Sequence, residues 1–158
     1  VGCQTHLKFG EQKRVFSMIP ALRNAEFVRY GVMHRNTFLD SPRLLDATYA
    51  LKAEPRIRFA GQMTGVEGYI ESTASGWTAG VAAAMEVLGR PMPQLDRFTA
   101  VGALASYISD HTVTKFQPMN INFGIIEPLG CKIKGKREKN AKISERALER
   151  IESLKGEL

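Results

Sequence analysis

The sequence has few of the residues that build metal sites and disulfide frameworks. Only two of its 158 residues are cysteines, Cys3 and Cys131, and only three are histidines. The cysteines lack C-x-x-C spacing, and neither His6 nor His111 has a potential metal ligand four positions further on. These absences argue against a metal site and against a disulfide framework. Sparse cysteine usage also agrees with a reducing compartment, so we expect a cytoplasmic protein.

Long apolar runs and a recognisable chain start are also missing. The longest weakly polar stretch, residues 79–88, is rich in alanine and too short to span a membrane. The chain begins Val1-Gly2-Cys3-Gln4, without an initiator methionine or a signal-peptide pattern. We therefore expect a fragment of a longer protein that does not associate with membranes.

The net charge of +6 is unevenly distributed along the chain. Residues 1–58 contain ten Lys and Arg against five Asp and Glu, and residues 132–158 contain nine against five. The segment between them, residues 59–131, is mildly acidic, with three against six. Basic patches attract nucleic acids by releasing counterions. The charge alone fits an RNA-binding protein as well as a merely soluble basic surface.

Hydrophobic periodicity predicts a mixed α/β fold. The expected helices cover residues 10–18, 66–88, 98–109 and 140–154, and the expected strands cover residues 25–33, 44–51 and 56–60. The last two strands would form a hairpin across residues 52–55. Residues 61–65 and 115–130 are expected to be loops.

The most informative segment is the glycine-bounded loop before the helix of residues 66–88. Gly61, Gly65 and Gly68 give the spacing G-x-x-x-G-x-x-G, which differs from the G-x-G-x-x-G dinucleotide motif. Glycines allow sharp turns and close approach of a ligand, and the N-terminus of a helix favours an electron-rich atom. We expect ligand approach at these three glycines. Further along the helix, Gly76 and Gly80 predict a close neighbour, most simply a sheet.

Four segments of the chain resemble one family, the bacterial folate- and FAD-dependent tRNA uracil-5 methyltransferases called TrmFO. The main segment is residues 59–76, FAGQMTGVEGYIESTASG. The others are residues 10–16 (GEQKRVF), 29–37 (RYGVMHRNT) and 116–124 (FQPMNINFG), and all four stand in the family's order. A single glycine motif would be weak, whereas four segments together are specific.

The resemblance implies a fold and a division into domains. The chain would be the carboxyl-terminal half of a glutathione-reductase-like FAD-binding domain together with part of an insertion domain. Residues 1–45 would belong to the substrate-facing insertion, and residues 46–158 to the FAD-binding domain. The amino-terminal G-x-G-x-x-G motif of the family is absent here, so the chain would need the missing half of the FAD domain as a partner.

The resemblance also implies a chemistry. Methylenetetrahydrofolate would supply the one-carbon unit, FAD would carry out the redox step, and NAD(P)H would recharge the flavin. The uracil would be activated by a nucleophilic cysteine. We expect that cysteine upstream of this chain, because neither Cys3 nor Cys131 stands at the matching position. No catalytic residue is therefore assigned here.

Binding residues follow from the same resemblance. FAD would contact the glycine loop and the start of the next helix, mainly through backbone amides: Gly61, Gln62, Met63, Thr64, Gly65, Val66, Glu67 and Tyr69. The Tyr69 ring would stack on the flavin or the pterin, or alternatively belong to the core. Folate or the RNA backbone would contact His34, Arg35 and Asn36. A flavin or pterin edge would contact Asn120 and Asn122.

Basic residues at both ends of the chain are the candidates for tRNA binding. They are Lys13 and Arg14 near the start, and Lys132, Lys134, Lys136 and Arg137 near the end. A solvated charged surface is the alternative for both groups. Two other functions also stay open: a related flavin-dependent enzyme that modifies ribosomal RNA or a wobble uridine, and a non-catalytic RNA-binding remnant.

Overall fold

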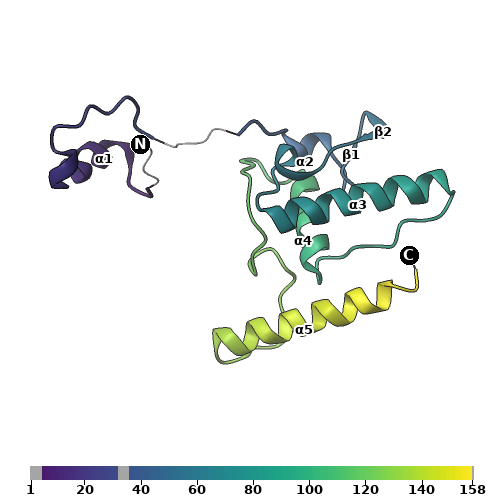
Figure 1. Cartoon of the computed structure of the whole chain (residues 1–158). Coiled ribbons are helices and arrows are strands. Elements are labelled where there is room, and N and C mark those ends of the chain that lie inside the picture. The colour runs from purple at the N-terminus through teal and green to yellow at the C-terminus, as the bar shows by residue number, and fades with distance from the viewer. Residues whose placement is uncertain (1–4, 32–35, 158) are drawn as a thin grey trace. The chain divides into compact units, whose positions relative to one another are not determined.

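The computed structural model describes residues 5–31 and 36–157, and the chain divides into two compact units, residues 1–36 and 37–158 (Figure 1). The described residues combine helices with a two-stranded sheet, in agreement with the mixed class that the sequence predicts. None of the helices in these described ranges is both long enough and apolar enough to cross a membrane.

The smaller unit is organised by one helix and one buried amide. Helix α1, Phe9–Phe16, confirms the helix predicted at residues 10–18, and a 3₁₀ turn, Pro20–Leu22, follows it. Gln12 is buried, and its side chain donates to the Leu7 carbonyl at 3.0 Å and accepts from the Gly31 N–H at 2.9 Å. These two bonds tie both ends of the described unit to α1.

The strand predicted at residues 25–33 is wrong for the described residues 25–31, which contain no strand. The rings of Phe27 and Tyr30 stack with centroids 5.2 Å apart, and Phe27 also stacks on Phe16 at 6.0 Å. A strand would place residues 27 and 30 on opposite faces. The alternating pattern therefore serves an aromatic cluster, and no neighbouring segment supplies a hydrogen-bond ladder.

The predicted hairpin is confirmed, but its first strand is shorter than expected and its second strand begins two residues earlier. Helix α2, Ser41–Leu44, is followed by strand β1, Ala50–Leu51, which pairs antiparallel with strand β2, Glu54–Arg58. The strand predicted at residues 44–51 is wrong before Ala50, because the Asp46 side chain builds a turn there. One carboxylate oxygen of Asp46 accepts from the Thr48 N–H, the Thr48 hydroxyl and the Ala50 N–H.

Tyr49 closes this turn in an uncommon backbone conformation. Its φ of +63° lies in the left-handed region, which costs a residue with a side chain about 1 kcal/mol or more. The side chain is 1% exposed, and burial of the ring offsets that cost. Burial also raises the pKa of the Tyr49 hydroxyl far above its ordinary value.

Three helices complete the larger unit. Helix α3, Tyr69–Val87, begins three residues later than predicted, and helix α4, Ala100–Ser109, begins after Thr99, whose hydroxyl accepts from the Gly102 N–H at 3.0 Å. Helix α5, Lys136–Leu154, begins four residues before its predicted start. These differences affect only helix ends, and all three predicted helices are confirmed.

The core of the larger unit lies where the hairpin, α3 and α4 meet. The main cluster consists of buried apolar residues from the hairpin, α3, α4 and the following loop: Leu45, Tyr49, Val66, Ala79, Leu104, Ala105, Ile108 and Phe116. A smaller cluster of Ala103, Ile126 and Ile143 packs α5 against α4. The core thus fixes one side of α3, while the other side stays exposed.

Candidate functional site

The glycine-bounded loop folds as a short 3₁₀ turn that leads into α3. The turn, η2, covers Gly61–Thr64, and Gly65 follows it in the left-handed conformation with a φ of +82°. Gly61 and Gly68 also have positive φ values, +67° and +100°. Glycine adopts such values without steric cost, so the three predicted glycines are explained first by the path of the backbone.

Protein atoms fill the space beside two of these glycines. A Cβ atom at Gly65 would lie 2.4 Å from the Phe116 ring, and one at Gly68 would lie 2.1 Å from the Glu71 carboxylate. At Gly61 the nearest atom is the Ser72 Cβ at 3.5 Å, an ordinary contact. Packing against the Phe116 ring therefore favours glycine at position 65, whereas at position 68 the atom is the end of a flexible side chain and the positive φ is the stronger reason for glycine. Ligand approach at the three glycines stays a prediction.

The two glycines within α3, Gly76 and Gly80, have no close neighbour among the described residues. A Cβ atom at Gly80 would meet nothing within 4 Å, and one at Gly76 would only touch the Ala60 side chain at 4.0 Å. No sheet of the described residues presses on these glycines, so the expected close neighbour stays a prediction. Strand β2 contacts α3 at another point, where Arg58 forms an ion pair with Glu86, and Gly80 belongs to the exposed side of the helix.

The glycine loop and the segment of residues 116–124 lie side by side. Val66 forms a parallel bridge with Met119: the Met119 N–H donates to the Gly65 carbonyl, and the Glu67 N–H donates to the Met119 carbonyl, both at 3.0 Å. The Asn120 side chain adds a bond of 3.1 Å to the Glu67 carbonyl. The fold thus brings together two segments that the sequence assigns separately to cofactor and substrate.

Glu71 joins the same two segments from the first turn of α3. Its carboxylate accepts from the Ile121 N–H at 3.3 Å. The Asn122 side chain accepts from the Gly124 N–H at 2.9 Å and donates to the Asn120 carbonyl at 3.3 Å, so it shapes its own loop. Sequence reasoning did not assign Glu71. Its position one helical turn after Gly68 is the signal that could have found it.

The predicted cofactor residues divide into buried and exposed members. Thr64, Gly65 and Val66 are buried, whereas Gln62, Met63 and Tyr69 are exposed. Tyr69 is 95% exposed, so the alternative of a core tyrosine is wrong. The N–H groups of Gly61 and Gly65 donate to the Ser75 hydroxyl and the Gln62 carbonyl. In cofactor binding, Gly61 and Gly65 would therefore shape the backbone, because their N–H groups already have partners within the chain.

Tyr69 allows a prediction that separates ligand binding from folding. Replacing the exposed ring in Tyr69→Ala should change the free energy of unfolding by less than about 0.5 kcal/mol. If the ring stacks on a flavin or pterin, the same change should weaken binding about tenfold, since aromatic stacking contributes about 1 kcal/mol. Flavin fluorescence titration and thermal unfolding measure the two effects. Tyr69→Phe is the control, and unchanged affinity in Tyr69→Ala would contradict the stacking role.

The other predicted substrate residues lie in the smaller unit or outside the described residues. His34 and Arg35 are outside the described residues, and Asn36 is exposed in a loop. Lys13 and Arg14 are exposed on α1, where Arg14 forms an ion pair with Glu11. Their roles in substrate and RNA binding stay predictions.

The basic run near the end of the chain is entirely exposed. Lys132 and Lys134 precede α5, and Lys136 and Arg137 are its first two residues. Cations at a helix N-terminus are unfavourable, because the helix dipole already places positive charge there. Lys136 and Arg137 therefore do not stabilise the start of α5, and the role of the basic run in RNA binding stays a prediction.

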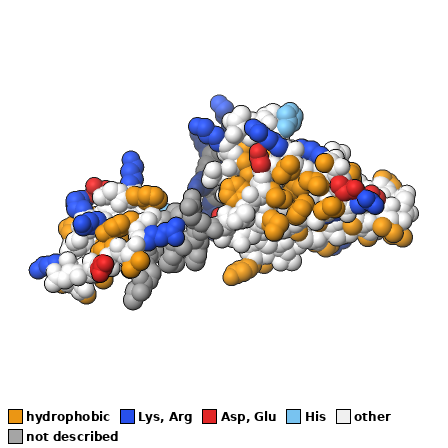
Figure 2. Space-filling model, turned by 90° about the horizontal axis from the view of Figure 1, so that it is seen from above, with side chains coloured by type: hydrophobic (Ala, Val, Ile, Leu, Met, Phe, Trp, Pro, Cys, Tyr) orange, Lys and Arg blue, Asp and Glu red, His pale blue; other side chains and the backbone are white. Residues whose placement is uncertain are grey.

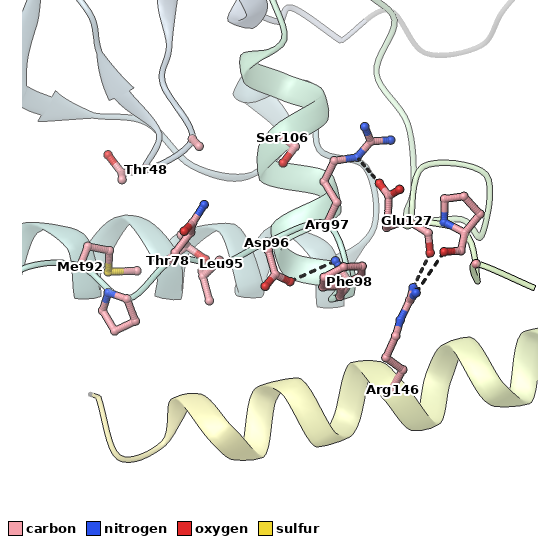
Figure 3. A pocket seen from close by; sticks show the side chains of 15 residues that line it. Thr48, Thr78, Met92, Leu95, Asp96, Arg97, Phe98, Ser106, Glu127 and Arg146 are labelled. Atoms are coloured by element: carbon pink, nitrogen blue, oxygen red, sulfur yellow. Dashed lines mark hydrogen bonds and ion pairs between the residues drawn. The ribbon is translucent and has the colours of Figure 1, made fainter.

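A cleft beside α4 and α5 was not anticipated from the sequence. It has a volume of about 860 Å³, and Figure 3 shows Arg97 paired with Glu127 and Arg146 pointing to backbone carbonyls. Arg97 lies 3.9 Å from Glu127, and Arg146 reaches from α5 to the carbonyls of Glu127 and Pro128. Arg146 also lies 4.6 Å from the centre of the Phe98 ring. These contacts connect α5 to the loops around α4. The charged side chains of the cleft therefore have a structural role.

A second, mostly apolar groove lies between α4, α5 and the loop that carries Asn122. Its volume is about 410 Å³, and Asn122 and Phe123 line one wall. On α5, Ile143 is buried, whereas Leu148 is 72% exposed. Within the described residues, no cluster of three or more His, Cys, Asp or Glu side chains could hold a metal ion.

Comparison of the sequence with known families and proteins identifies the family of the chain. The profile of the Glucose inhibited division protein A family matches residues 1–91, which is more than half of the chain. The chain belongs to this family.

Individual relatives have a more specific name, methylenetetrahydrofolate–tRNA-(uracil-5-)-methyltransferase TrmFO. The chain is 60% identical over 148 residues to the protein of that name from Acetivibrio thermocellus. It is 56% identical over 155 residues to that of Desulfitobacterium hafniense, and 56% identical over 158 residues to that of Listeria monocytogenes. These matches confirm the resemblance to TrmFO.

The matches cover nearly all of this chain but only part of each relative. They include 94%, 98% and 100% of this chain, against 34%, 36% and 36% of the three relatives. The chain therefore spans about a third of the length of the curated relatives it matches.

Proposed function

We propose that this chain is part of a methyltransferase that uses methylenetetrahydrofolate and FAD to form 5-methyluridine in the T-loop of tRNA. The observation that carries the proposal is the junction of the glycine loop with the segment of residues 116–124. In it, Met119 and Asn120 are hydrogen-bonded to Gly65 and Glu67. The names of the relatives supply the reaction class.

The residues at this junction fit a flavin. Gly68 precedes α3 without any side-chain cap on the helix, so the first N–H groups of α3 are left for an electron-rich group such as a flavin edge. Gln62, Met63 and Tyr69 are exposed beside it and would hold the ring system. A bound flavin would supply the redox chemistry of the transferred carbon. This chain would bind and orient it, and Asn120 and Asn122 would contact the folate.

The remaining parts of the proposal concern partners outside this chain. NAD(P)H would reduce the flavin, and a nucleophilic cysteine from another part of the protein would activate the uracil. We further propose that the chain forms the carboxyl-terminal half of the FAD-binding domain and part of an insertion, with the boundary near residue 45. An enzyme that acts on tRNA would work in the cytoplasm.

The exposed side of α3 favours the view that another part of the full-length protein packs on the larger unit. Its residues are apolar or small and none is charged: Tyr69, Ile70, Thr73, Trp77, Gly80, Ala84, Val87 and Leu88. Ile70 is 80% exposed and Val87 is 87% exposed, and Figure 2 shows hydrophobic side chains gathered on the surface of this unit. A contiguous exposed apolar surface commonly marks an interface with another protein or domain. The other two thirds of the relatives' length can provide the covering surface.

Gly80 offers a test of this docking surface. A Cβ atom at Gly80 meets nothing within 4 Å, so Gly80→Arg should leave the unfolding free energy of this chain unchanged or raise it by up to about 1 kcal/mol. In the full-length protein the same arginine should prevent docking and reduce flavin retention on gel filtration. Leu148→Arg, on the exposed side of α5, is the matched control. Full flavin retention by the Gly80→Arg protein would exclude this surface as the interface.

The reaction is tested with the full-length protein that we propose carries this chain. It is incubated with labelled methylenetetrahydrofolate, FAD, NAD(P)H and total bacterial RNA, and the labelled nucleotide is mapped. Label in the T-loop uridine of tRNA is the expected result. Label in ribosomal RNA or at a wobble uridine would replace the proposal with the related activity. RNA binding without label would indicate a non-catalytic RNA-binding protein.

A further inference from the structure

Three buried hydroxyl groups surround the loop of residues 61–65. Ser41 and Thr64 are fully buried, and Ser75 is 1% exposed. They come from three different elements, α2, η2 and α3. A buried hydroxyl without a hydrogen-bond partner is strongly unfavourable, so its presence in a core requires a specific bond.

Each of these hydroxyls bonds to the loop backbone. The Ser41 hydroxyl donates to the Thr64 carbonyl at 2.9 Å, and the Thr64 hydroxyl donates to the Gly61 carbonyl at 2.7 Å. The Ser75 hydroxyl accepts from the Gly61 N–H at 2.7 Å and donates to the Ser72 carbonyl at 2.7 Å. Both polar groups of the Gly61 backbone are therefore held by side-chain hydroxyls.

The carbonyl groups of the whole loop are turned into the protein. All five carbonyls of residues 61–65 accept a hydrogen bond from this chain. The donors, in order, are the Thr64 hydroxyl, the Gly65 N–H, the Leu39 N–H, the Ser41 hydroxyl and the Met119 N–H. The exposed part of the loop is Gln62 and Met63. It therefore presents side chains and backbone atoms to a ligand, but its carbonyl oxygens are already hydrogen-bonded within the chain. Such a surface suits a ligand whose own edge accepts hydrogen bonds.

We propose that Ser41, Thr64 and Ser75 are positioning residues that hold the Gly61–Gly65 loop in its ligand-binding conformation before any cofactor binds. The inference rests on the proposed function for the identity of the ligand, FAD, but the fixed loop is a property of this chain. None of the three side chains is exposed enough to touch the cofactor itself. Their contribution is the rigidity of the loop, which reduces the ordering that binding requires.

The position of Thr64 provides a matched pair of substitutions. Thr64→Val keeps the shape of the side chain and removes the hydroxyl, whereas Thr64→Ser keeps the hydroxyl and removes a methyl group. Both variants are made in the full-length protein, and Ser41→Ala is added as a second way to release the loop. Thr78→Val is the control, because Thr78 is equally buried on α3 and its hydroxyl bonds only to the Ala74 carbonyl.

Two measurements are made on each variant. Amide hydrogen exchange of residues 62–66 without FAD should be at least about tenfold faster in Thr64→Val and Ser41→Ala than in Thr64→Ser or Thr78→Val. FAD affinity by fluorescence titration should fall about tenfold in the first two variants and stay within about twofold in the others. Equal exchange in Thr64→Val and Thr64→Ser would overturn the positioning role. Faster exchange in a protein that never binds FAD would support it while refuting the proposed function.

Discussion

Gly102→Ala should destabilise the larger unit severely. Gly102 is buried in the first turn of α4, where a Cβ atom would lie 2.0 Å from the Asp96 carbonyl oxygen and 2.6 Å from that of Leu95. Both obstacles are backbone, and the Asp96 side chain is held by Arg150 at 2.7 Å. The loop cannot move aside without breaking that ion pair. We expect a loss of about 3 kcal/mol or more in the free energy of unfolding.

Gly80→Ala is the matched comparison, since it makes the same chemical change in a helix where the Cβ atom meets nothing. It should raise the free energy of unfolding by about 0.5–1 kcal/mol, because alanine has the higher helix propensity. Urea unfolding followed by circular dichroism measures both effects. Wild-type stability in Gly102→Ala would show that the loop at residues 95–96 does not approach α4 this closely.

Neutralising the basic run at the start of α5 should strongly reduce RNA binding. The variant carries glutamine at four exposed positions: Lys132, Lys134, Lys136 and Arg137. Each lost phosphate contact lowers the salt dependence of binding by about one unit, so the slope of log affinity against log salt should fall by about three to four. We expect affinity for tRNA at moderate salt to fall about 100-fold. Filter binding at several salt concentrations measures both quantities.

The control for this variant carries glutamine at four exposed basic residues outside the run: Arg43, Arg90, Lys115 and Lys155. It has the same net charge, so a general electrostatic effect would weaken both proteins equally. The stability of the first variant should be unchanged or slightly higher, because it removes cations from the N-terminus of α5. Equal RNA affinity in both variants would show that the basic run is only a solvated charged surface.

Local sequence patterns were sufficient for α1, α3, α4 and α5, but they did not predict the short helix α2. Helix α3 has good helix formers between a glycine turn and Gly89, and Thr99 caps α4, so both are specified within their own residues. The hairpin was also predictable, because its strands are joined by a short connection. The glycine spacing and the four family-like segments were sufficient to recognise the family.

The failed strand predictions have a common cause. Alternation over residues 25–31 and 44–49 describes a pattern of side chains, but a strand also needs a neighbour to complete its hydrogen bonds. Phe27 instead stacks on Phe16 and Tyr30, and Asp46 draws the backbone of Thr48 and Ala50 into a turn. Neither competing interaction is visible in hydrophobic periodicity.

The composition of the candidate site was determined by the sequence, and its assembly by the tertiary structure. Glycines at 61, 65 and 68 follow from local backbone requirements, since only glycine adopts those positive φ values without strain. The pairing of Val66 with Met119 and the bond from Ser41 to Thr64 join residues 53 and 23 positions apart. Such contacts depend on how α2, α3 and the loop after α4 pack around one core. No pattern along the chain contains that information, because packing selects partners by proximity in space rather than by spacing in sequence.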